Sequence, residues 1–168
     1  TLEELWPKLH AGDREPFPDD ETHQEAWRAF HSGAFGRAVR LADQVGIEAH
    51  AVANKATGIY ATYLEDKDAR PLAFFEAAVE RAEAAIEAFP DDPNAHYFHA
   101  FNLGRYSQSI SVVKGLKQGI GGKLQRSLQR AVEVAPGVGV ADPALGRSHA
   151  VLLAPVGALI GALASGAR

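Results

Sequence analysis

The chain has 168 residues, of which 46% are hydrophobic and 23% charged, a balance typical of a packed globular protein rather than a disordered or fibrous one. It contains no Cys, which excludes disulfide frameworks, thiol nucleophiles and iron–sulfur ligation. The net charge of −4 hides a division, because residues 1–92 carry 9 Lys+Arg and 19 Asp+Glu, whereas residues 93–168 carry 8 and 2.

Helix signals recur along the chain, while strand signals are poor. Asp19 and Asp20 precede a helical pattern, and acidic residues at a helix start cap its free amides. Three further starts place Pro71, Pro93 and Pro143 in the first turn, where a proline costs no hydrogen bond. Apolar residues then repeat at helical spacing. The pattern predicts helices near residues 2–10, 20–32, 35–45, 47–64, 71–88, 93–106, 108–118, 121–134, 143–153 and 156–164.

Short helices joined by short turns favour antiparallel neighbours, so we expect an all-α fold of stacked helical hairpins. A single domain spans residues 1–168, with an N-terminal extension at 1–20 and an apolar C-terminal segment at 150–168. That segment has no charge from Ala150 to Ala167, yet Pro155 interrupts it and its large apolar residues keep helical spacing. These features predict a helix packed against one neighbour rather than a membrane span.

Two helix ends align with each other: Ala82 to Pro90 and Leu128 to Pro136 each have an alanine three residues after the first and a proline five residues later. This pattern resembles the tetratricopeptide repeat (TPR) family, in its divergent bacterial members with insertions between the repeat helices. By this resemblance, the motif residues in the first helix of one repeat are Tyr97, Ala100, Phe101 and Gly104. Those in the first helix of the next repeat are Leu145, Gly146 and His149. The resemblance implies a right-handed superhelix of about three degenerate repeats and a C-terminal half repeat.

The C-terminal half repeat lacks its second helix. Leu145, Gly146 and His149 open a first helix, but no second helix with its terminal proline follows. An unpaired repeat exposes the apolar face that its partner helix would cover. We therefore expect that the chain continues past Arg168 or that residues 150–168 associate with another molecule.

Two motifs resemble ligand sites but lack essential residues. His96 and His99 lie one helical turn apart, but two histidines without a third ligand do not complete a metal site, so no metal is predicted. The glycine-rich stretch 115–123 has Lys117 and Leu124 where a phosphate loop needs Gly and Ser or Thr. No nucleotide or other cofactor is predicted. The stretch is then a plain turn or a place where Lys123 holds an anion.

No catalytic set is apparent, so we expect a binding protein rather than an enzyme. Ser107, Ser109, Ser111 and Ser127 show no pairing with His and Asp that follows the logic of a triad. Residues 93–132 contain six basic and no acidic side chains. Because these charges are spread over several helices and the first half is acidic, an acidic protein partner is favoured over nucleic acid.

The first helix of each repeat lines the concave side of a TPR superhelix, and that side binds extended peptides or, in some relatives, a ligand. The resemblance implies a scaffold or adaptor that binds a protein or peptide partner in this groove. The candidate binding residues combine stacking surface, a polar clamp and positive charge: Asn94, Tyr97, Phe101, Arg105 and Lys123. The alternative is a transporter-associated protein that binds a small apolar or anionic ligand. Both alternatives are compatible with bacterial cytoplasm or periplasm.

Overall fold

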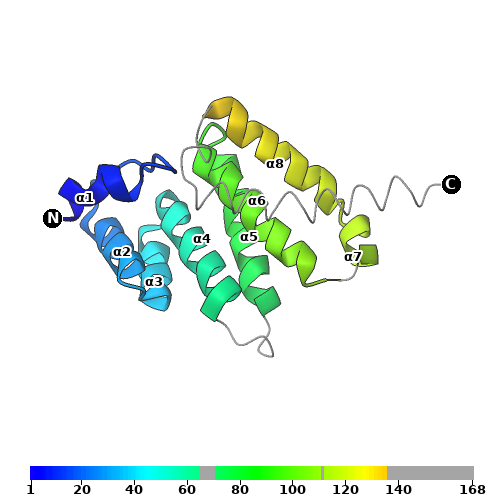
Figure 1. Ribbon diagram of the computed structural model, residues 1–168, viewed down its shortest axis with the longest axis horizontal. Helices are drawn as coiled ribbons and strands as arrows, with labels where there is room; N and C mark the ends of the chain where they lie inside the picture. The colour runs from blue at the N-terminus through cyan, green and yellow to red at the C-terminus, as the bar shows by residue number, and fades with distance from the viewer. Residues whose placement is uncertain (65–70, 111, 136–168) are drawn as a thin grey trace.

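The computed structural model describes residues 1–64, 71–110 and 112–135, and every regular element in these ranges is helical (Figure 1). The elements in chain order are α1 (Leu2–Leu9), α2 (Glu21–His31), α3 (Phe35–Val45), a 3-10 turn (Ile47–Ala49), α4 (His50–Ile59), a π-helical turn (Tyr60–Leu64), α5 (Pro71–Ala88), α6 (Pro93–Gln108), α7 (Val112–Lys117) and α8 (Ile120–Val134). The predicted all-α class is therefore confirmed. The predicted helices 143–153 and 156–164, and the apolar segment 150–168, lie outside the described residues.

The helix starts follow the local chemistry of the sequence. The Asp20 carboxylate accepts a hydrogen bond from the His23 amide at 2.8 Å, and the Asp92 carboxylate accepts one from the Asn94 amide at 2.9 Å. Both contacts satisfy an amide that has no partner inside its helix. As expected, α5 and α6 each begin with a proline. Within the ranges described, no helix is long and apolar enough to span a lipid bilayer.

The predicted helix 47–64 is instead three consecutive pieces. Gly46 ends α3 with a φ of 103°, a 3-10 turn follows, and α4 gives way to the π-helical turn after Ile59. Apolar spacing did not reveal these changes, because 3-10, α and π turns all return the chain to the same side after three to five residues. Near this point α4 comes close to α6: a β-carbon on Gly58 would lie 2.6 Å from the Phe101 ring.

From α2 to α6, helices that are adjacent in sequence pack against each other, and α8 packs on α6 past the short α7 (Figure 1). The pairs α2–α3, α4–α5 and α6–α8 are in contact, and α3 also packs on α4 and α5 on α6. In addition, α4 contacts both α2 and α6. The first helix of the second pair, α4, therefore contacts both helices of the first pair, and the first helix of the third pair, α6, contacts both helices of the second.

Two hydrophobic clusters hold these helices together. The first surrounds Trp27 and joins α1–α4 to the start of α6, while the second surrounds Leu124 and joins α5, α6 and α8. Alanines allow close packing of the second helices of the first two pairs, with Ala38, Ala82 and Ala85 fully buried. Helix α6 belongs to both clusters, and twelve of its sixteen residues are buried. It therefore forms the centre of the molecule rather than an open surface.

The predicted N-terminal extension is packed onto the helical body. Trp6, only 6% exposed, stacks on the His10 ring with centroids 3.9 Å apart. It also makes edge contacts with Trp27 of α2 at 5.5 Å and with Phe17 at 5.1 Å. The Trp6 indole donates a hydrogen bond to the Glu15 carbonyl at 2.7 Å. Residues 2–17, called the N-terminal strap below, thus belong to the first hydrophobic cluster.

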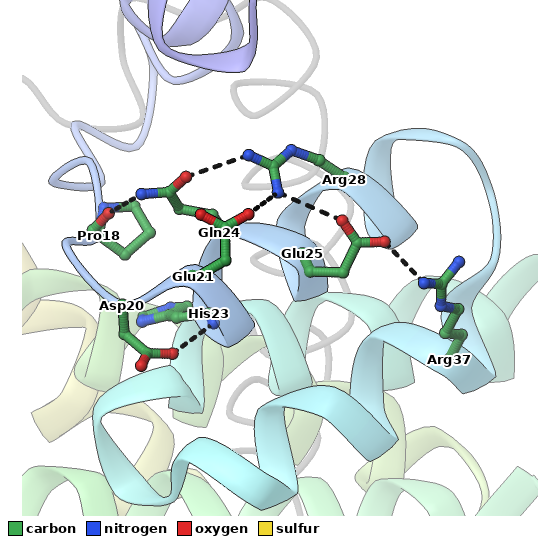
Figure 2. Close-up of polar contacts among 8 residues, drawn as sticks. All are labelled: Pro18, Asp20, Glu21, His23, Gln24, Glu25, Arg28 and Arg37. Atoms are coloured by element: carbon green, nitrogen blue, oxygen red, sulfur yellow. Dashed lines mark hydrogen bonds and ion pairs between the residues drawn. The ribbon is translucent and has the colours of Figure 1, made fainter.

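A chain of polar contacts covers the outer face of α2 (Figure 2). The Arg28 guanidinium donates hydrogen bonds to Glu21, Gln24 and Glu25, and the Glu25 carboxylate also accepts one from Arg37 of α3 at 2.7 Å. Pairs this exposed contribute little energy individually. Of these contacts, the one between Glu25 and Arg37 joins α2 to α3, and the buried rings supply most of the stabilisation.

Candidate functional site

Four of the five candidate binding residues lie on one side of α6. Tyr97 and Phe101 stack with their ring centroids 6.5 Å apart, and the Arg105 guanidinium lies 5.8 Å from the Phe101 ring. Asn94 is only 2% exposed and donates a hydrogen bond from Nδ2 to the Glu15 carboxyl of the N-terminal strap. This side of α6 is therefore largely covered, and Arg105 is the least buried of the four.

Lys123, the fifth candidate, lies apart from them. It belongs to α8, where its Nζ contacts the Glu83 Oε1 of α5 at 3.0 Å. The neighbouring part of α6 is the side that carries His99 and Leu103. With 3.6 residues per turn, that side is roughly opposite the stripe of Asn94 and Arg105. The structure thus brings four candidates together and separates the fifth.

An open groove runs between α5 and α8 over the second side of α6, and we call it the α5–α8 groove. It consists of two hollows of about 330 Å³ each, which both include Glu83 and Lys123. One wall is acidic (Glu76, Glu80 and Glu83 of α5), the other is basic (Lys123, Arg126 and Arg130 of α8), and the floor is His96, His99, Leu103 and Tyr106 of α6. The Lys123–Glu83 ion pair divides the groove where the hollows meet.

The basic wall retains positive charge beyond this ion pair. Arg130 contacts Asp91 at 2.5 Å, but Arg126 is exposed and joins no ion pair with any residue that the structure describes. Burial alone would raise the pKa of Glu83, but the hydrogen bond and charge of Lys123, together with His99, hold it below its usual value. Glu83 is therefore an ionised carboxylate bound to the basic wall.

Where α8 meets the groove floor there is a serine–histidine contact that the sequence did not predict. The Ser127 hydroxyl lies 2.7 Å from His99 Nδ1, and His99 Nε2 lies 3.5 Å from Glu83 Oε1. Serine, histidine and carboxylate follow each other as in a hydrolytic triad, but with the two ring nitrogens of the histidine exchanged. However, Ser127 lies in the interior of α8, where backbone amides are engaged within the helix and cannot form an oxyanion hole. We therefore interpret the contact as one that packs α8 on α6.

The two histidines examined as metal ligands have separate partners. His96 Nε2 lies 2.8 Å from the Pro90 carbonyl, whereas His99 is engaged with Ser127. Across residues 1–64, 71–110 and 112–135, no three His, Asp or Glu side chains are placed to hold a metal ion. The glycine-rich stretch 115–123 spans the end of α7, the link through Gly119 with a φ of 63°, and the first turn of α8, which begins at Ile120. The Lys123 amide is bonded to the Gly119 carbonyl, so only its side chain faces the groove.

The strap carries a second polar cluster that the sequence did not predict. The Asp13 carboxylate contacts His10 Nδ1 at 2.9 Å and Lys55 Nζ of α4 at 2.7 Å. His10 Nε2 in turn lies 3.2 Å from His31 Nε2 of α2. The three-residue spacing of His10 and Asp13 was the only local signal, because their partners lie 21 and 42 residues away from them.

Comparisons of the chain with known protein families, with curated proteins and with solved structures find no match. The function is therefore inferred from the groove and the strap themselves, since a helical fold is compatible with many functions.

Proposed function

We propose that the chain is a non-catalytic, TPR-like scaffold that binds an acidic segment of a protein partner in the α5–α8 groove. The observation that carries the proposal is the basic wall of Lys123, Arg126 and Arg130 beside a floor that includes Tyr106 and Leu103. Basic and aromatic side chains together suit a segment that carries carboxylates and apolar residues. Of the candidates from the sequence, Lys123 contacts the partner directly.

The TPR-like part of the proposal is supported by the packing order. In stacked helical hairpins, each hairpin buries its apolar face against its neighbour. Helix α4 contacts both helices of the preceding pair and the first helix of the next, as expected for stacked hairpins. The buried alanines of α3 and α5 are consistent with the small residues of the family's second helices.

The Lys123–Glu83 pair indicates how a partner's carboxylate would bind. Both side chains are 44% exposed, and ion pairs at such exposure contribute about 0–1 kcal/mol. Exchange of Glu83 for a carboxylate of the partner therefore costs little. Arg126 then supplies a second positive charge without loss of an existing ion pair, which favours acidic over neutral segments.

The test uses a partner captured by crosslinking in the source cell. Lys123→Glu combined with Arg126→Glu should weaken its binding at least tenfold, and added salt should weaken binding to the parent chain. The matched control is Lys8→Glu with Arg40→Glu, which changes the net charge equally at exposed positions outside the groove. Equal affinities of the groove variant and the parent would contradict the proposal.

A small anionic ligand is the second candidate for the same groove. Each hollow has the volume of a small-molecule site at the lower end of the usual range. Native mass spectrometry of the purified chain distinguishes the two candidates. A bound mass of a few hundred daltons that the groove variant lacks favours the small ligand, whereas a bare chain that still captures its partner favours the scaffold.

A further inference from the structure

The strap is attached to the helical body at two polar points. At the first, Asp13 binds Lys55 of α4 and His10 faces His31 of α2. At the second, the Glu15 carboxyl accepts a hydrogen bond from the Asn94 side chain of α6. The strap therefore contacts the first helix of all three helix pairs. It covers the end of the α6 side on which the sequence placed the binding residues.

The Asn94 amide is only half satisfied by an ionised Glu15. Its Nδ2 donates to the carboxyl, but its Oδ1 is buried and accepts no hydrogen bond. A protonated carboxyl provides an O–H donor for that oxygen, whereas a carboxylate provides none. An unpaired buried acceptor is costly, so the amide favours the protonated form of Glu15.

The surrounding charges favour the same form. Asp92, at the start of α6, and Asp13 of the strap both place negative charge near the Glu15 carboxyl, and Lys55 opposes them with positive charge. Asp92 also contacts His50 Nε2 of α4 at 2.7 Å, and the hollow that Glu15 borders is lined in addition by Asp19, Asp20, His23 and Glu48. Burial first, and then the charge of Asp92, raise the pKa of Glu15 to about 8, while the hydrogen bond from Asn94 and the charge of Lys55 oppose the rise. The unpaired Asn94 oxygen and the surrounding charges thus favour the same protonated form of Glu15, which is partly buried at the edge of an open hollow.

We propose that the N-terminal strap is a proton-dependent cover for the Asn94 side of α6, closed when Glu15 is protonated and bonded to the Asn94 amide, and opened when Glu15 ionises. The proton passes to solvent on opening. An open strap uncovers Asn94 and removes Trp6 from the cluster that also contains Tyr97. This inference does not depend on the α5–α8 groove, which lies on the opposite side of α6.

The direction of the pH dependence follows from proton linkage. The closed state binds the Glu15 proton more tightly than the open state, so closing is most favourable below the ordinary Glu pKa and weakens as pH rises towards about 8. His31 acts at lower pH: burial, then the charges of His10 and Lys55, lower its pKa to about 4, while Asp13 opposes this. Closing therefore also weakens as pH falls below about 6.5.

The experiment is amide hydrogen exchange of the full chain at pH 6.5 and 8.5, corrected for intrinsic exchange rates. The opening equilibrium of residues 2–10 should rise at least tenfold, as expected for one linked proton, while the central amides of α6 keep their protection. Glu15→Gln should remove this dependence, because its side-chain amide is neutral at every pH and still donates to Asn94. Glu3→Gln, at an exposed position of the same strap, should retain the pH dependence of strap opening.

Three results would overturn the proposal: strap protection equal at both pH values, a pH dependence that persists in Glu15→Gln, or simultaneous loss of protection in the strap and α6. Asp92→Asn provides a second variant should Glu15→Gln fail to fold. It removes the nearby charge, lowers the pKa of Glu15 and should reduce the change in opening between pH 6.5 and 8.5. An unreduced change in Asp92→Asn would also contradict the proposal.

Discussion

Asp13 shows how a single buried carboxylate links the strap to the helices. It is 6% exposed and lies between His10 and Lys55. Burial alone would raise the pKa of Asp13, but the hydrogen bonds from His10 and Lys55 and the charge of Lys55 outweigh burial and hold it well below its usual range. The carboxylate thus remains ionised within the fold.

Asp13→Asn should reduce the free energy of unfolding by about 2–4 kcal/mol at pH 7, because it leaves Lys55 without its counter-charge. A carboxyl with a lowered folded pKa contributes stability above its ordinary pKa and loses it as pH falls, so the difference should shrink below about pH 4. Urea unfolding of Asp13→Asn and of the parent chain, at pH 7 and below about pH 4, measures this difference in the free energy of unfolding. Asp19→Asn, at an exposed carboxylate, is the control, and equal losses in the two variants would contradict a specific role for Asp13.

The spacing of Asn94, Tyr97 and Phe101 predicted that these residues share one side of α6, because it follows a helical stripe. It did not predict that this side is covered, since the covering residue, Glu15, lies 79 residues from Asn94. No periodic pattern contains such a contact. For Lys123, the sequence shows the charge but not the position. Its place on the side of α6 opposite the Asn94 stripe depends on how α8 packs against α6.

Among the elements, α4 packs tightly on α6 at Gly58, a contact that the sequence did not reveal. Gly58 is surrounded by Phe101 and Asn102 of α6, so Gly58→Ala should destabilise the fold by about 1–3 kcal/mol through overpacking. Gly36→Ala is the matched control in α3, where the new methyl group meets only the end of Arg40, and it should be neutral or stabilise by up to about 1 kcal/mol. Thermal or urea unfolding tests both, and a Gly58→Ala variant as stable as the parent would show that α4 and α6 can move apart freely.

Most helix positions were predictable because their starts have local chemical causes. Asp20, Asp92 and the first-turn prolines act within a few residues, and α2, α5 and α6 begin where these residues place them. The two second helices that the repeat pattern aligns, α5 and α8, differ in how deeply their aligned alanines are buried. Ala82 is fully buried between neighbouring helices, whereas Ala131 of α8 is only partly buried. Burial of a small residue depends on a helix stacked on it, which a repeat pattern alone does not guarantee.

At the scale of the whole molecule, stability should not depend on a metal ion. His96 and His99 have partners within the protein, and each other buried histidine in the part of the chain that the structure describes packs in the core or makes a local polar contact. Addition of a strong chelator should leave the melting temperature unchanged. A drop of several degrees that zinc restores would contradict this expectation and assign a structural role to these histidines.

The chain has only two tryptophans, and both lie at the same end of the molecule in edge contact with each other. Intrinsic fluorescence therefore reports on the strap and α2, and not on the region where α8 packs against α5 and α6. A fluorescence transition that precedes loss of the circular dichroism signal would reveal release of the strap from a molecule that is still helical. The two optical signals together thus separate a local opening from global unfolding without any added label.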